Sequence, residues 1–71
     1  MDYARAEYVA RTNREVARML RRIYEEYDAL SDMEVKLEHV TDPIRKRTLE
    51  YDYQDALRRI ADFEMLIQRE F

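Results

Sequence analysis

Nucleophilic catalysis is the first chemistry to consider, because the chain holds one serine and one histidine, Ser31 and His39. A serine nucleophile needs a base within hydrogen-bond reach and a third group that orients this base. No residue is placed for that third role. The sequence also contains no glycine, which excludes the glycine-rich loops that bind phosphates. We therefore expect a non-enzymatic protein with no small-molecule substrate.

Metal binding is the second chemistry, and it also depends on the single histidine. The chain has no cysteine, so thiolate ligands are excluded. Carboxylate sites in helical bundles use a Glu-x-x-His spacing, which does not occur here. Glu34 and Glu70 fall on core-facing positions, but at opposite ends of the expected fold. We expect no metal and no cofactor, and we interpret His39, beside Glu38 and Asp42, as an ordinary turn residue.

Arginine shows the most regular spacing of any charged residue, and it outnumbers lysine by eleven to two. Guanidinium groups suit phosphates and carboxylates, so a row of arginines on the outer face of a helix is a candidate nucleic-acid site. Dedicated nucleic-acid binders are usually basic, whereas this chain has a net charge of −3 and a pI near 5.1. Nucleic-acid binding is therefore the alternative function, and its candidate residues are Arg11, Arg14, Arg18, Arg21 and Arg22.

The elements that position these residues are predicted to be helices. Glycine is absent and Pro43 is the only proline, which favours helix over the turns and bulges of a β-fold. Apolar residues recur in steps of three and four along two blocks, as in helices that pack closely side by side. Asp42 suits the cap and Pro43 the first position of a helix. We predict an all-α fold, a single domain over residues 1–71, built as an antiparallel helical hairpin of about 3–40 and 43–70.

The predicted core consists of five layers across this hairpin, and in each layer the residue numbers are centred on the turn between Thr41 and Asp42. The layers are Val16 with Ile67, Leu20 with Phe63, Ile23 with Ile60, Tyr27 with Ala56, and Leu30 with Tyr53. Two alternatives stay open. Ser31 and Glu34 have the spacing of a capping box, which would break the first helix near residue 31. Alternating apolar residues in 33–37 and 49–53 would instead form a β-hairpin.

Self-association is expected because a chain of 71 residues buries only a small core. Small domains gain further stability from disulfides, a metal or oligomerisation, and without cysteines or a metal site only oligomerisation remains for this chain. The second helix carries more apolar surface than one neighbouring helix needs. We predict that two hairpins form a homodimeric four-helix bundle. Its predicted self-association residues are Leu57, Met65, Leu66 and Phe71.

Charge is distributed unevenly in a way that favours an antiparallel dimer. Residues 1–24 hold six arginines against three acids, and residues 25–42 hold one lysine against seven acids. Antiparallel pairing of the first helix with its copy places the basic part on the acidic part. We therefore predict that the chain binds a second copy of itself.

The N-terminal segment is the predicted site for another protein. The register of the hairpin leaves residues before 12 without a partner within the chain, and this overhang is rich in tyrosine and arginine, which are common at interfaces. The predicted partner-binding residues are Tyr3, Arg5, Tyr8, Val9 and Arg11.

The expected function is that of a small protein–protein interaction module, a regulator, adaptor or inhibitor of another protein. Such short accessory proteins are typical of bacteria and their phages. A structural component of a larger assembly is a third alternative. No apolar stretch has the length of a membrane span, and the first residues lack the apolar block of a signal peptide, so we expect a cytoplasmic protein that does not enter a membrane.

Overall fold

The computed structural model describes residues 1–71 and consists of three helices without a strand. They are α1 (Tyr3–Ala10), α2 (Arg14–His39) and α3 (Pro43–Gln68). The all-α prediction is confirmed. The alternative β-hairpin is wrong, because 33–37 lies inside α2 and 49–53 inside α3. None of the three helices has the length and apolar character needed to cross a membrane.

Each helix begins at a residue whose side chain accepts a hydrogen bond from the first turn. Asp42 Oδ1 accepts from the Ile44 amide at 3.0 Å, and Pro43 occupies the first helical position, as predicted. Asp2 Oδ1 accepts from the Arg5 amide at 3.1 Å at the start of α1. These short side chains satisfy amide groups that have no partner within the helix.

The predicted continuous helix over 3–40 is wrong, because the chain breaks at residues 11–13. Asn13 has an extended backbone, and its Oδ1 accepts a hydrogen bond from the Val16 amide at 3.2 Å, so it caps α2. The alternative break near residue 31 is also wrong, since Ser31 lies within the uninterrupted α2. α1 ends at Ala10 with Arg11 as its C-cap, and Asn13 caps the start of α2, whereas the spacing of Ser31 and Glu34 begins no new helix.

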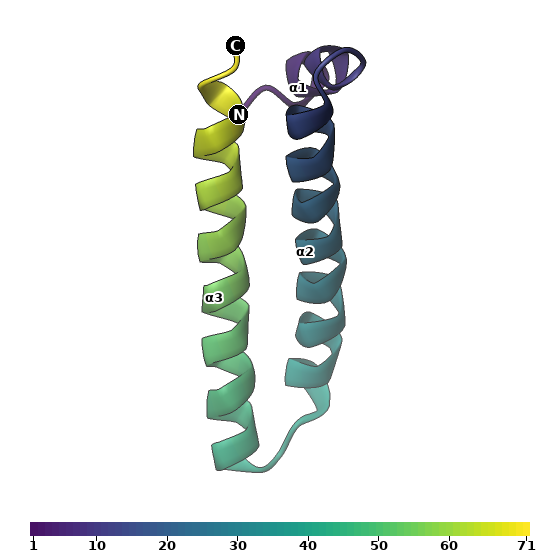
Figure 1. Cartoon of the computed structure of the whole chain (residues 1–71). Coiled ribbons are helices and arrows are strands. Elements are labelled where there is room, and N and C mark those ends of the chain that lie inside the picture. Colours follow the sequence, from purple (N-terminus) through teal and green to yellow (C-terminus); the bar gives the residue numbers. More distant parts are fainter.

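α2 and α3 lie side by side and run in opposite directions, joined by the loop 40–42 (Figure 1). The molecule is elongated, with extents of 46 × 17 × 16 Å. Its core is a single cluster along the contact of these helices, extended at one end by α1. The buried residues are Ala6, Val16, Leu20, Ile23, Leu30, Ala56, Ile60 and Ile67.

The structure buries part of the predicted core. Val16 and Ile67 are both buried, as are Ile23 and Ile60. The layer of Tyr27 differs, because this side chain is 42% exposed. Its hydroxyl lies toward α1, 3.3 Å from that of Tyr3.

α1 does not overhang the hairpin but turns back at residues 11–13 and packs beside the first half of α2, at the end of the molecule that carries both termini (Figure 1). Ala6 is fully buried in this contact, so the prediction that residues before 12 lack a partner within the chain is wrong. An isolated helix of eight residues is marginal in water. The contact with α2 and α3 therefore stabilises α1.

Candidate interaction surface

Tyr3 anchors α1 to both long helices. Its hydroxyl donates to Glu64 Oε2 of α3 at 2.7 Å, and its ring stacks on that of Tyr24 in α2, with 6.3 Å between the ring centroids. Burial raises the pKa of the Tyr3 phenol well above its usual value, and the bonds with Tyr27 and Glu64 raise it further. Tyr3 is thus a structural contact within the chain, whereas we had predicted a contact with another protein.

A second tyrosine strengthens the same contact. The Tyr24 hydroxyl of α2 donates to Glu7 Oε1 of α1, and this hydrogen bond raises the pKa of the Tyr24 phenol. Val9 also turns inward and packs against the core. The inward side of α1 therefore serves the fold and is not free for a partner.

The outward side of α1 presents the other three predicted partner residues. Arg5, Tyr8 and Arg11 follow one another at steps of three, which places them on one face of a helix. Tyr8 is 70% exposed, and the Arg11 guanidinium lies 5.8 Å from the centroid of its ring. The Arg5 guanidinium lies 5.4 Å from the ring centroid of Phe71. We call Arg5, Tyr8, Arg11 and Phe71 the α1 surface.

Phe71, one of the predicted self-association residues, lies beside α1 in the structure. The structure brings the end of the chain back to α1, as the two termini in Figure 1 show. The signal that identifies this contact is the pairing of an arginine with an aromatic ring, but 66 residues separate Arg5 from Phe71, so the sequence alone does not reveal it. The α1 surface thereby gains a second aromatic residue.

The other three predicted self-association residues are exposed but point in different directions. Leu57 and Leu66 are 39% and 41% exposed and lie nine residues apart on α3. Nine residues are about two and a half helical turns, so these side chains lie on opposite sides of the helix. Met65 is exposed as well, on the outer side between them. A single partner helix cannot cover all of them.

The candidate nucleic-acid residues are divided too. Arg14, Arg18 and Arg21 surround a shallow hollow of about 210 Å³ on the outer side of α2. Arg11 lies apart from them, at the corner above Tyr8. The same side of α2 continues with Glu25, Asp28 and Asp32, all exposed at steps of three and four. Phosphates bound along this row would meet three carboxylates, the first of them about one turn beyond Arg21.

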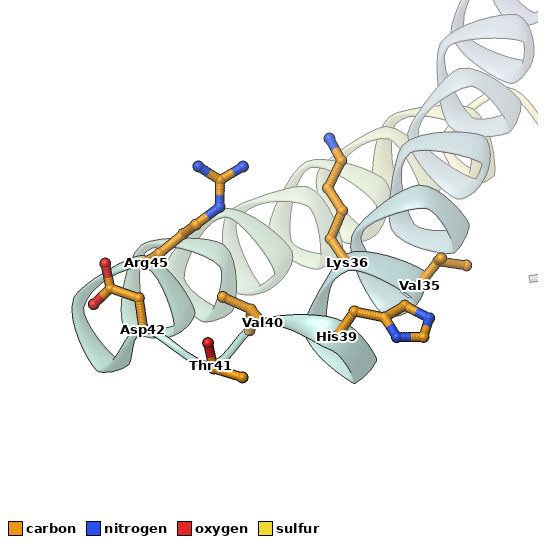
Figure 2. Close-up of a pocket in the computed structure, with 7 residues that line it drawn as sticks. All are labelled: Val35, Lys36, His39, Val40, Thr41, Asp42 and Arg45. Atoms are coloured by element: carbon orange, nitrogen blue, oxygen red, sulfur yellow. The ribbon is translucent and has the colours of Figure 1, made fainter.

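A larger hollow of about 440 Å³ lies at the loop end of the molecule (Figure 2). Lys36 and Arg45 project from its rim to the same side, whereas His39 points away from them (Figure 2). The carboxylate of Asp42 is occupied by the Ile44 amide. The lining residues are largely exposed, and small-molecule sites enclose most of their ligand. The hollow is therefore a surface depression flanked by two cationic side chains and is not a closed pocket.

Comparisons with known proteins identify no relative: the chain matches no protein-family model, no curated protein and no solved structure.

Proposed function

We propose that this protein is a non-enzymatic protein–protein interaction module that acts as a helical homodimer and presents the α1 surface to another protein. The observation that carries this proposal is the balance of apolar residues. Ten large apolar side chains are exposed, whereas the core contains eight buried residues, of which two are alanines. A neighbouring chain that covers part of this exposed apolar surface adds to a core that is small for a chain of this length.

The homodimer is the arrangement that we infer for the α2–α3 pair, with two antiparallel pairs forming a four-helix bundle. Packing of a second copy buries additional apolar surface, which a single chain of this length cannot bury within itself. Sedimentation at micromolar concentration tests this: we expect the mass of a dimer, and a monomer would reject the homodimer.

The α1 surface suits a partner protein because arginine, tyrosine and phenylalanine are enriched in interface centres. Its aromatic rings are held by Arg5 and Arg11, which reduces the conformational entropy lost on binding. No buried polar side chain in this region lacks a hydrogen-bond partner. Tyr8 is 70% exposed, so a partner can reach its ring without displacing α1 from the core.

The test is affinity capture from the native host with a tagged chain, comparing the wild type with the Tyr8→Ala/Arg11→Ala variant. We expect the variant to lose the captured protein while keeping its helical circular dichroism and its sedimentation mass. Tyr51→Ala is the matched control, because Tyr51 is about as exposed as Tyr8 but lies on α3. Equal capture by all three chains would contradict a partner site on α1.

A nucleic-acid-binding regulator is the second candidate, supported by the hollow among Arg14, Arg18 and Arg21. Binding through phosphates falls steeply as salt rises. RNA or DNA binding at low salt that weakens in the Arg18→Ala/Arg21→Ala variant would favour this function over the first.

A further inference from the structure

α1 covers one side of the α2–α3 pair and leaves the opposite side open. On α2, α1 packs against Ala17, Leu20, Arg21 and Tyr24, which line a small hollow together with Glu7 and Ala10. On α3, it reaches Glu64 through the hydroxyl of Tyr3. Near the termini, α1 therefore prevents a second copy of the chain from packing on this side of the α2–α3 pair.

The residues on the opposite side can be identified from helix geometry. Two residues that are nine positions apart are separated by two and a half turns, so their side chains point in opposite directions. Met33 lies nine residues after Tyr24, and Glu26 lies nine after Ala17, so both point away from α1. On α3, Leu66 lies opposite Leu57, and Phe63 is one turn from Leu66. We call this side the uncovered face, and define it by Met19, Glu26, Met33, Arg59, Phe63 and Leu66.

The residues that define the uncovered face are apolar toward its two ends and charged in the middle, where Asp52 and Asp55 also lie close enough to act on Arg59. Met19, Met33 and Phe63 pack against the core but remain half-buried, and Leu66 is exposed. In the middle, Arg59 binds Glu26 with two hydrogen bonds of 3.0 Å across the α2–α3 contact. Arg59 and Glu26 thus neutralise each other, and Glu26 retains only 11% side-chain exposure. A neighbour that covers this pair therefore buries two paired charges, which costs less than burying either charge alone.

Its size matches a stable dimer. The molecule is 46 Å long and 17 Å wide, so one side offers roughly 800 Å² of projected area, about what each partner contributes to a standard interface. The charges of α2 select the orientation. Residues 14–24 hold four arginines and one acid, whereas residues 25–39 hold six acids and one lysine. An antiparallel neighbour places these halves of opposite charge beside each other.

From this apolar stripe, its size and the charge layout, we infer that the second copy packs antiparallel on the uncovered face, so that α2 lies beside the partner subunit's α2 and α1 stays outside the interface. This inference rests on the homodimer of the proposed function. It further assigns Leu66 to the interface and excludes Leu57 from it.

Leu57 and Leu66 provide the test, because they are the same residue type, lie on the same helix and are equally exposed. We expect Leu66→Glu to raise the dimer dissociation constant at least about 100-fold, since a symmetric dimer buries the added charge twice. We expect Leu57→Glu to change it by less than about threefold. Sedimentation measures both, and circular dichroism verifies that each variant remains helical.

The outcomes separate the two proposals. A wild-type chain that is a monomer at micromolar concentration overturns the homodimer and this inference with it. A wild-type dimer that survives Leu66→Glu, or that dissociates with Leu57→Glu, overturns the uncovered face alone. If Leu66→Glu reduces helicity, the smaller polar variant Leu66→Gln replaces it, with Leu57→Gln as the control, and the same comparison decides.

Discussion

At the residue scale, the tyrosines of this chain fall into two groups, those that stabilise the fold and those that are exposed. The residue type alone does not show to which group a tyrosine belongs. Tyr3 and Tyr24 hydrogen-bond carboxylates across helix contacts, as does Tyr53, which donates to Glu34 at 2.8 Å. Tyr8 and Tyr51 make no side-chain hydrogen bond and are largely exposed. A hydroxyl that donates to a carboxylate stabilises the fold, whereas an exposed ring is available to a partner.

The raised pKa of the Tyr3 phenol predicts a dependence of stability on pH. In the folded chain this phenol holds its proton more tightly than in the unfolded chain, where its pKa is near 10. The stabilisation is therefore complete below pH 10 and is lost as the pH rises above it. The pKa values of Tyr24 and Tyr53 are also raised, chiefly by a hydrogen bond to a carboxylate, and these phenols contribute with the same sign.

We expect Tyr3→Phe to lower the free energy of unfolding by about 1 kcal/mol at pH 8, and to lose less stability than the wild type between pH 8 and pH 11. Urea unfolding at the two pH values measures both effects. Tyr51→Phe is the control, and it should leave the unfolding free energy within about 0.5 kcal/mol of the wild type. A pH dependence that Tyr3→Phe leaves unchanged would show that other groups cause it.

At the element scale, the break between α1 and α2 depends on one side chain. Residues 11–13 contain neither glycine nor proline, and helical periodicity continues across them from Val9 to Val16. Asn13 nonetheless caps α2, and the docking of α1 compensates for the helical bonds lost at the corner. Ser31 has the residue type of a cap, but it lies in the interior of α2, where both neighbouring turns keep their backbone bonds.

The two positions predict opposite responses to alanine. Asn13→Ala removes a cap and should lower the free energy of unfolding by about 1 kcal/mol. Ser31→Ala replaces serine with a better helix former and should raise it by a few tenths of a kcal/mol. Urea unfolding of the two variants makes the comparison. A larger loss for Ser31→Ala than for Asn13→Ala would contradict these roles.

At the scale of the whole molecule, the elongated shape makes the orientation of a dimer measurable. The loop 40–42 lies at one end and both termini lie at the other (Figure 1). An antiparallel dimer that overlaps over its full length places the two loops at opposite ends, close to the 46 Å length of one chain. A parallel dimer places them side by side.

Because the chain has no cysteine, Thr41→Cys introduces a single site for a nitroxide spin label. We expect the distance between the two labels, measured by pulsed electron spin resonance, to be on the order of 40 to 50 Å in an antiparallel dimer of helices this long. Labels less than about 25 Å apart would show that the helices are parallel. The labelled chain should keep the sedimentation mass of the wild type.

The sequence by itself determined the helical class, the start of α3 and most of the core. Heptad spacing places Val16, Leu20, Ile23, Ile60 and Ile67 on one stripe whatever the partner helix, and they are all buried. Asp42 and Pro43 act locally, through a cap and a fixed backbone angle, so their effect is visible in the sequence. The sequence also predicts that Tyr3, Arg5, Tyr8, Val9 and Arg11 lie outside the core, and of these Arg5, Tyr8 and Arg11 are exposed.

Only the tertiary structure decided where α1 lies and which apolar residues share a face. Docking of α1 depends on contacts of Tyr3 with residues about twenty to sixty positions away in the chain, which helical periodicity does not reveal. Leu57 and Leu66 are alike in sequence, but the position of α1 makes their surroundings different. Periodicity describes one helix at a time, whereas an interaction surface depends on which helices already cover it.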